Sequence, residues 1–116
     1  MPSRSSLGPL SDIKRNIELA RSFVRDSSFE AFQKDTRTAY AVLRSLEIIT
    51  EASRRLPDDM KARHPEIPWS DMARAGNFYR HYYERIVDEF VWRTVQDDLG
   101  PLLAAVEQEL AALRSE

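Results

Sequence analysis

The stretch "DTRTAYAVLRSLEIITEASRRL", residues 35–56, contains neither glycine nor proline. Its apolar residues recur mostly every three or four positions, which is the pattern of an amphipathic helix with one buried face. The residues on this face are Ala39, Val42, Leu43, Leu46, Ile49, Ala52 and Leu56. At 3.6 residues per turn the segment would form about five to six turns. We therefore expect residues 35–56 to be the central helix of the hydrophobic core.

Another amphipathic helix is expected on the N-terminal side of this segment. Residues 1–10 contain Pro2, Gly8 and Pro9 among serines, which indicates a flexible leader. Ser11 is the expected N-cap. The buried stripe that follows has spacings of four, three and four, and it consists of Ile13, Ile17, Ala20 and Val24. The connection "DSSFEAFQKD" predicts a short helical turn capped by Ser27 or Ser28 and held by Phe29 and Phe32.

On the C-terminal side, Pro57 should stop or bend the central helix, because proline removes a backbone donor and clashes with the preceding turn. A short helix is expected in "DDMKARH", and a further helix should begin near Trp69 or Ser70. Residues 88–114 carry apolar residues at helical spacing, with a kink expected at Gly100-Pro101. These patterns predict a single all-α domain over residues 11–116, an up-and-down bundle of four main helices with short helical turns.

The composition restricts the classes of function. The chain has 116 residues, a formal net charge of −2 and no cysteine, and 42% of its residues are hydrophobic. A disulfide framework and a thiolate metal site are thereby excluded. No apolar run approaches the roughly 20 residues of a membrane span, and the N-terminus lacks an apolar signal core. We expect a soluble cytoplasmic protein. The net charge is unfavourable for nucleic-acid binding in general, but a local basic segment can still bind phosphate.

Such a basic segment is "RAGNFYRHYYER", residues 74–85, which has three arginines, one histidine and a single acid. On a helix, Arg74, Asn77 and His81 would share one face, with Arg80 and Arg85 flanking the histidine. A histidine titrates near neutral pH, so this group could hold a phosphodiester and move a proton. The alternatives are a solvated helix face and a dimer contact. Spacing alone does not choose between them.

Other candidate sites are weaker. His64 lies in a connection flanked by proline, far in sequence from His81, and there is no metal-binding or phosphate-loop signature. We expect no metal and no cofactor. Glu47 and Glu51 would share a face of the central helix as paired carboxylates. The alternative interpretation is that the pair is solvated or forms salt bridges to arginines such as Arg44 and Arg55.

The sequence from Ile67 to Leu110 resembles the HepT-like proteins of the HEPN superfamily. The residues that carry this resemblance are the "IPW" of residues 67–69, the "HYY" of residues 81–83, the "VW" of residues 91–92 and the "DLGPL" of residues 98–102. The stretch "RTAYAVLRSLEIITEASRRLP", residues 37–57, resembles the second helix of these proteins. The resemblance covers nearly the whole chain after the leader, and it implies a HEPN-like, homodimeric helical bundle.

The resemblance also implies an activity and a partner. Family members are toxins in which the arginine and histidine motifs of two protomers face a shared cleft and cleave RNA without metal. The ribose 2′-OH would attack its own phosphate while His81 moves protons, and Arg74 or Arg80 would stabilise the charged transition state. Asn77 and Arg85 would support RNA binding. The partner is a small MNT-type nucleotidyltransferase antitoxin, which would attach AMP to the tyrosine of the H-x-Y motif, here Tyr83.

The chain departs from the commonest family spacing at one position. With four residues between arginine and histidine, the arginine would be residue 76, where this chain has Gly76. Glycine inside a helix costs about 1 kcal/mol relative to alanine, so we expect another element to approach the backbone closely there. Arg74 lies two turns, roughly 10 Å, before His81. Two functions remain open: a HepT-like ribonuclease toxin, and a non-catalytic HEPN module that binds the nucleotidyltransferase. A purely structural bundle is the weaker third interpretation.

Overall fold

The structure, a computed structural model, describes residues 4–80 and 88–115, and every regular element within those ranges is helical. The expectation of an all-α fold is confirmed for this part of the chain. The elements are η1 (Arg4–Ser6), α1 (Leu7–Val24), α2 (Phe29–Lys34), α3 (Thr36–Arg54), α4 (Asp58–Ala62), α5 (Trp69–Arg80), α6 (Asp88–Arg93), the π-helical segment η3 (Thr94–Asp98) and α7 (Leu99–Arg114).

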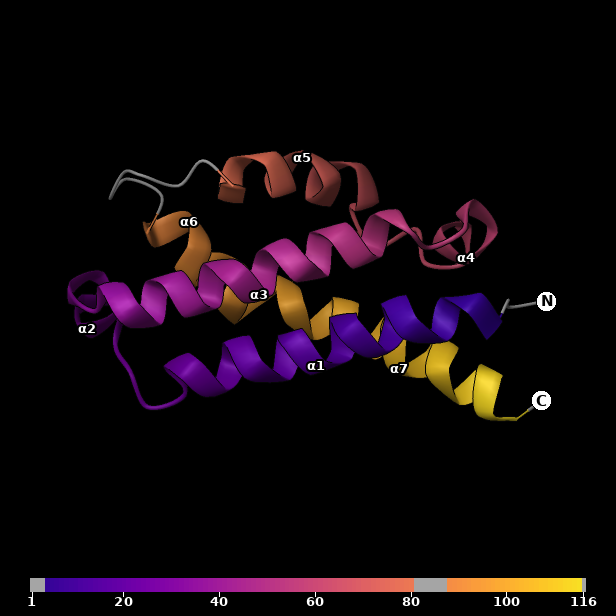
Figure 1. The fold of residues 1–116 in the computed structure, drawn as a ribbon, viewed down its shortest axis with the longest axis horizontal. Helices are drawn as coiled ribbons and strands as arrows, with labels where there is room; N and C mark the ends of the chain where they lie inside the picture. Colours follow the sequence, from indigo (N-terminus) through magenta and orange to yellow (C-terminus); the bar gives the residue numbers. More distant parts are fainter. Residues whose placement is uncertain (1–3, 81–87, 116) are drawn as a thin grey trace.

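The helix α3 is the centre of the bundle, as its sequence predicts. It packs against α1 on one side and α5 on the other, while α7 packs along α1 (Figure 1). Successive long helices run in opposite directions, which gives the up-and-down topology. The interior positions of α3 are almost completely buried, with Val42, Leu46, Ile49 and Ala52 at most 2% exposed. The periodicity of residues 35–56 therefore identified the buried face correctly.

The ends of the short elements also follow the sequence. The Asp35 carboxylate accepts a hydrogen bond from the Thr38 backbone N–H at 3.1 Å, and it thereby caps α3. Hydrogen bonds from Thr38 lower the pKa of Asp35 below its ordinary value. The Ser28 hydroxyl accepts from the Ala31 N–H at 3.1 Å and caps α2. These contacts confirm the expected helical turn before the central helix and the start of the helix itself.

Two expected boundaries were wrong. The helix α1 begins at Leu7, so the boundary expected at residue 10 and the N-cap expected at Ser11 lie inside it. Proline is tolerated in the first turn, where its missing N–H would have no helical partner, and the burial of Pro9 and Leu10 extends the packed face.

The second difference concerns the interruption before the last helix, which lies at residues 94–98 rather than at Gly100-Pro101. Pro101 is the third residue of α7 and occupies its first turn. The preceding turn is π-helical instead of being broken at the proline. A proline ring clashes with the carbonyl four residues earlier, here residue 97, so a widened turn at this level accommodates Pro101.

Candidate functional site

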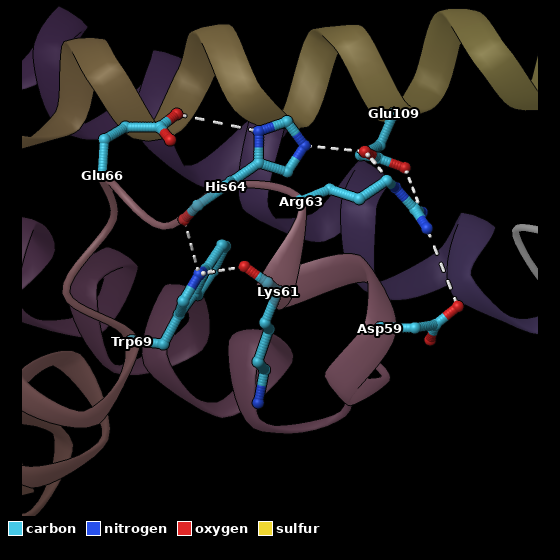
Figure 2. Close-up of polar contacts among 7 residues, drawn as sticks. All are labelled: Asp59, Lys61, Arg63, His64, Glu66, Trp69 and Glu109. Carbon is cyan, nitrogen blue, oxygen red and sulfur yellow. Dashed lines mark hydrogen bonds and ion pairs between the residues drawn. The ribbon is translucent and has the colours of Figure 1, made fainter.

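The helix α5 carries the first half of the basic segment, and its start is fixed by Trp69. The Trp69 indole N–H donates to the backbone carbonyls of Lys61 and His64, both at 3.1 Å (Figure 2). These two carbonyls belong to the end of α4 and the turn after it. Ile67, just before the helix, is 4% exposed and belongs to the core. The "IPW" motif is therefore the anchor that places the first turn of α5.

A partly buried ionic cluster, with Arg63 at its exposed edge, holds this connection against α7. Glu109 accepts hydrogen bonds from Arg63 at 2.8 and 3.2 Å, and its Oε2 atom lies 2.6 Å from His64 Nε2 (Figure 2). The Arg63 hydrogen bonds lower the pKa of Glu109 below its ordinary value, against the opposing effect of burial. His64 and Glu109 are each 6% exposed. His64 is thus a structural residue, which joins the approach to α5 to the last helix.

Gly76 lies where α5 comes closest to α3. A Cβ atom at this position would stand 2.8 Å from Thr50 Oγ1 and 3.2 Å from Thr50 Cβ. Real Cβ atoms essentially never approach a neighbouring atom as closely as the first of these distances. The α-helical conformation continues through Gly76, which has no positive φ. The expected close approach is confirmed: Gly76 is a packing residue, and its face of α5 points at α3.

Two further contacts fix α5 along its length. From α3, the Arg54 guanidinium donates to the Ala73 carbonyl at 2.6 Å. Near the other end, Tyr79 is 4% exposed, and its ring centroid lies 6.2 Å from that of Phe90 on α6. Burial raises the pKa of the Tyr79 phenol. With Trp69, Gly76 and these contacts, α5 is attached to the rest of the bundle from its first turn to its last.

The opposite side of α5 presents polar residues of the basic segment to solvent. Arg74 and Asn77 are both exposed, and Arg74 forms an ion pair with Asp71 one turn earlier. Arg80 is the last residue of α5. Three predicted site residues, His81, Tyr83 and Arg85, lie outside the described part of the chain. The structure therefore places Arg74 and Asn77 on one exposed surface, and the assignment of the site residues, these two included, stays a prediction.

The other flank of α5 borders an apolar cavity of about 340 Å³ between α3, α5 and the η3 segment. Apolar side chains such as Leu46, Met72 and Leu99 line it. The carboxylates on its lining are Glu66, Asp71, Asp97 and Asp98. Burial raises the pKa of Asp98, and the neighbouring Asp97 raises it further. A polyanion such as RNA is repelled from this acidic lining, so the side of α5 that carries Arg74 and Asn77 is the better candidate.

Sequence reasoning missed Glu109. It occupies an interior position of α7, three residues after Val106 and four before Leu113, both of which are buried. A charged residue on an apolar stripe indicates a buried ion pair, because an unpaired charge would be very costly there.

Among the described residues, no three His, Cys, Asp or Glu side chains gather as metal ligands, and no helix is long and apolar enough to cross a membrane.

Comparison with known proteins gives the relationships of the chain. Residues 13–109 match the ribonuclease HepT-like family. The "Probable ribonuclease HepT" of Thermococcus cleftensis is 43% identical over 105 residues, which are 90% of this chain and 96% of that protein. A "Putative RNase" of Methanocaldococcus jannaschii is 34% identical over 116 residues, covering all of this chain and 96% of the relative.

A third relative, a "Putative RNase" of Caldanaerobacter subterraneus, is 32% identical over 101 residues, or 87% of this chain and 90% of that protein. No solved structure matches significantly. The family match spans most of the chain, from within α1 to within α7, and it includes the whole of α5. This coverage, together with the close agreement in length between the chain and these relatives, establishes the family. The chain belongs to the HepT-like ribonuclease family of the HEPN superfamily.

Proposed function

We propose that this protein is a metal-independent endoribonuclease that acts in the cytoplasm as a homodimer. The observation that carries the proposal is the family relationship over residues 13–109, because those residues include the whole basic segment. The structure supports it through α5, a firmly attached helix that directs Arg74 and Asn77 to solvent. Rigid support is what a catalytic group needs, because small displacements cost large factors in rate.

The proposed reaction uses the RNA itself as nucleophile. The 2′-oxygen of a ribose attacks the adjacent phosphorus, and the bond from phosphorus to the 5′-oxygen of the next nucleotide breaks. The products are a 2′,3′-cyclic phosphate and a free 5′-hydroxyl. His81 takes the proton from the 2′-hydroxyl and returns a proton to the leaving 5′-oxygen. Charge builds up on the non-bridging oxygens, where an arginine stabilises it. Asn77 and Arg85 help to hold the substrate.

The arginine that serves this reaction is either Arg74 or Arg80. Position 76 is a glycine packed against Thr50, so it has no side chain to contribute to the reaction. Arg74 precedes His81 by about two helical turns, roughly 10 Å, which is too far for both to reach one phosphate on a regular helix. Arg80 is adjacent to His81 in sequence. In a symmetric dimer, Arg74 of one protomer can instead serve His81 of its partner, which is why the proposed site is composite.

The proposed physiological role is that of a toxin opposed by an MNT-type nucleotidyltransferase antitoxin. Transfer of AMP to Tyr83 would add a bulky anion beside the arginines and block RNA entry. Two other tyrosines are close in sequence, Tyr79 and Tyr82. Tyr79 is 4% exposed, with its hydroxyl-bearing ring packed near Phe90, so it is a poor acceptor. The burial of Tyr79 supports an AMP acceptor in the H-x-Y motif rather than within α5.

A second candidate function is a non-catalytic HEPN module that binds a nucleotidyltransferase. The observation that favours it is Gly76, because this residue replaces the arginine of the commonest family spacing and serves α3 packing instead. The formal net charge of −2 favours it as well. The two candidates differ in one measurable property, which is cleavage of RNA by the purified chain.

The proposal is tested with a fluorescently labelled single-stranded RNA and the purified protein in buffer containing a metal chelator. We expect cleavage by the unsubstituted protein and none by His81→Ala. Arg74→Ala and Arg80→Ala then identify the arginine, since the essential one should lower kcat about 100-fold or more. Circular dichroism of each variant shows that the fold is intact. Cleavage by His81→Ala at the normal rate would refute the catalytic assignment, and no cleavage by the unsubstituted protein would favour the non-catalytic module.

A further inference from the structure

An aromatic and basic stripe runs along the exposed face of α3, and the proposed chemistry does not use it. It consists of Arg37, Tyr40 and Arg44, which are spaced by three and four residues and therefore lie on one side of the helix. Tyr40 is 60% exposed, more than the other exposed large hydrophobic residues of the described chain, Leu7, Phe23 and Phe90. Arg37 is exposed, and the Arg44 side chain is 71% exposed. We call this set the α3 stripe.

The α3 stripe leads to the end of α5. Thr50 faces Gly76 and Arg54 contacts Ala73, so residue numbers rise along α5 as they fall along α3. Counted at 1.5 Å per residue, Arg44 lies about 9 Å beyond the level of Thr50, while Arg80 lies about 6 Å beyond Gly76. Both helices thus approach the same end of the bundle, as Figure 1 shows. Arg44 is near the level of Arg80, and the rest of the stripe extends beyond it.

The chemistry of the stripe fits one class of ligand. A tyrosine ring held on a rigid helix offers a flat apolar surface on which a nucleobase can stack, and stacking tolerates any base. An arginine on each side supplies positive charge for the phosphates before and after that base. The bases of double-stranded RNA are already stacked within the duplex, so they cannot use such a ring. A ligand that stacks a base on this ring must therefore be single-stranded.

The acidic residues near the α3 stripe set where its positive charge ends, but they do not neutralise it. Glu47 lies 3.8 Å from Arg44, a separation longer than a hydrogen bond, so the guanidinium keeps donors for a phosphate. Glu47 thus pairs with Arg44, as the salt-bridge interpretation expected, whereas Arg55 pairs with Asp12. Glu51 is exposed further along the same face. The favourable surface consequently extends from Arg44 to Arg37, where the charge of Arg37 also acts on the neighbouring Asp35 carboxylate.

From these observations we infer that the α3 stripe binds single-stranded RNA next to the cleavage site, with one base stacked on Tyr40 and the flanking phosphates on Arg37 and Arg44. The inference rests on the proposed ribonuclease function and names the form of RNA that the site accepts. The stripe acts in binding and not in the bond-breaking step. Its loss should therefore raise KM and leave kcat nearly unchanged.

Binding is measured by fluorescence anisotropy with a labelled single-stranded oligonucleotide carrying 2′-O-methyl groups, which cannot supply the attacking hydroxyl. Tyr40→Ala should weaken binding about tenfold or more, because a stacking contact is lost. Tyr40→Phe keeps the ring and should bind like the unsubstituted protein. Tyr40→Leu keeps an apolar side chain without the aromatic face and should resemble Tyr40→Ala. With cleavable RNA, the same variants should change KM by the same factors, with kcat within about twofold.

The arginines are tested through salt dependence. Arg37→Gln and Arg44→Gln should each lower the slope of log affinity against log salt concentration by about 0.7, the value for one phosphate contact on a single strand. Arg15→Gln is the matched control, since Arg15 is an exposed arginine on α1 and its loss changes the net charge equally. An equal effect of Arg15→Gln would show diffuse attraction and overturn the inference.

The remaining outcomes separate this inference from the proposed function. Unchanged affinity for Tyr40→Ala in a protein that still cleaves RNA overturns the stripe and leaves the function standing. Tyr40→Leu with normal binding, or a halved mass of Tyr40→Ala in light scattering, would assign Tyr40 to an apolar contact between protein chains and overturn the stripe as well. An unsubstituted protein that neither binds nor cleaves RNA overturns both.

Discussion

Replacement of Gly76 by alanine tests why a glycine stands inside α5. Two opposing effects are expected. Alanine is the better helix former by about 1 kcal/mol, which would stabilise α5. The added Cβ, however, would stand 2.8 Å from Thr50 Oγ1, whose hydroxyl donates to the Glu47 carbonyl at 2.9 Å. Forcing an extra carbon into such a packed contact costs about 1–3 kcal/mol. We expect Gly76→Ala to be destabilising by about 1 kcal/mol.

The same substitution should change sign when Thr50 is shortened. In Thr50→Ala the hydroxyl oxygen is removed, and the remaining Cβ distance of 3.2 Å requires a shift of only a few tenths of an ångström. Gly76→Ala should then stabilise Thr50→Ala by up to about 1 kcal/mol, the helix propensity gain alone. The coupling free energy between the two positions is measured by urea unfolding of the unsubstituted protein, Gly76→Ala, Thr50→Ala and the double variant. Unfolding is followed by circular dichroism at 222 nm.

A control is available in α1. A Cβ added at Gly8 would have no neighbour within 4 Å, so Gly8→Ala should not be destabilising. If Gly76→Ala has the same effect with Thr50 as with Ala at position 50, then the close approach of α3 does not require the glycine, and the reasoning is refuted. An arginine at position 76 begins with the same Cβ. Gly76→Arg should therefore destabilise the fold as well, and should not simply restore the family motif.

The remaining predictions concern the ionic cluster, the dimer and the modified tyrosine. Glu109→Gln should lower the free energy of unfolding by about 2 kcal/mol at neutral pH, because Arg63 and His64 lose a charged acceptor. The pKa of Glu109 is lowered in the fold, so the stabilisation by its carboxylate is complete above the ordinary pKa of 4.5 and is lost as the pH falls through the lowered pKa. In Glu109→Gln the free energy of unfolding should therefore depend less on pH on the acid side. An unchanged pH dependence would contradict this role of Glu109. Light scattering at micromolar concentration should give twice the chain mass of 13.4 kDa, and a strict monomer would rule out a composite site. Incubation with the partner nucleotidyltransferase and ATP should add AMP to a peptide containing Tyr83 and not to Tyr83→Phe, whereas modification confined to Tyr79 or Tyr82 would be contrary to the assignment.

The bundle could be predicted well because its helices are amphipathic and uninterrupted. In residues 35–56 the apolar period and the stop at Pro57 both indicate the same helix, and the structure has it at Thr36–Arg54. Boundaries at proline were less predictable. Pro9 and Pro101 both stand in the first turn of a helix, where the residue is tolerated, although the sequence pattern alone suggested a leader and a kink at these points.

The candidate site was predictable in part. The close approach at Gly76 followed from the cost of a glycine inside a helix, but the identity of its neighbour, Thr50, depends on how two helices pack. His64 was set aside as a metal ligand because it lies in a proline-flanked connection far from His81, and its actual partner, Glu109, is 45 residues away in sequence. Long-range ion pairs of this kind leave only an indirect signal, a charged residue on an apolar stripe. Arg74 and Asn77 lie on the surface of α5 as their spacing suggests.

The chemical identity of the RNA ends after cleavage distinguishes attack by the ribose 2′-hydroxyl from metal-dependent hydrolysis. Attack by the ribose 2′-hydroxyl leaves a 2′,3′-cyclic phosphate on one fragment and a 5′-hydroxyl on the other. Mass spectrometry of the fragments, produced by the purified protein in the presence of a metal chelator, measures both ends in one experiment. We predict the cyclic phosphate and the 5′-hydroxyl, with neither formed by His81→Ala. Fragments ending in a 3′-hydroxyl and a 5′-phosphate, or cleavage that stops when metal is chelated, would contradict the account.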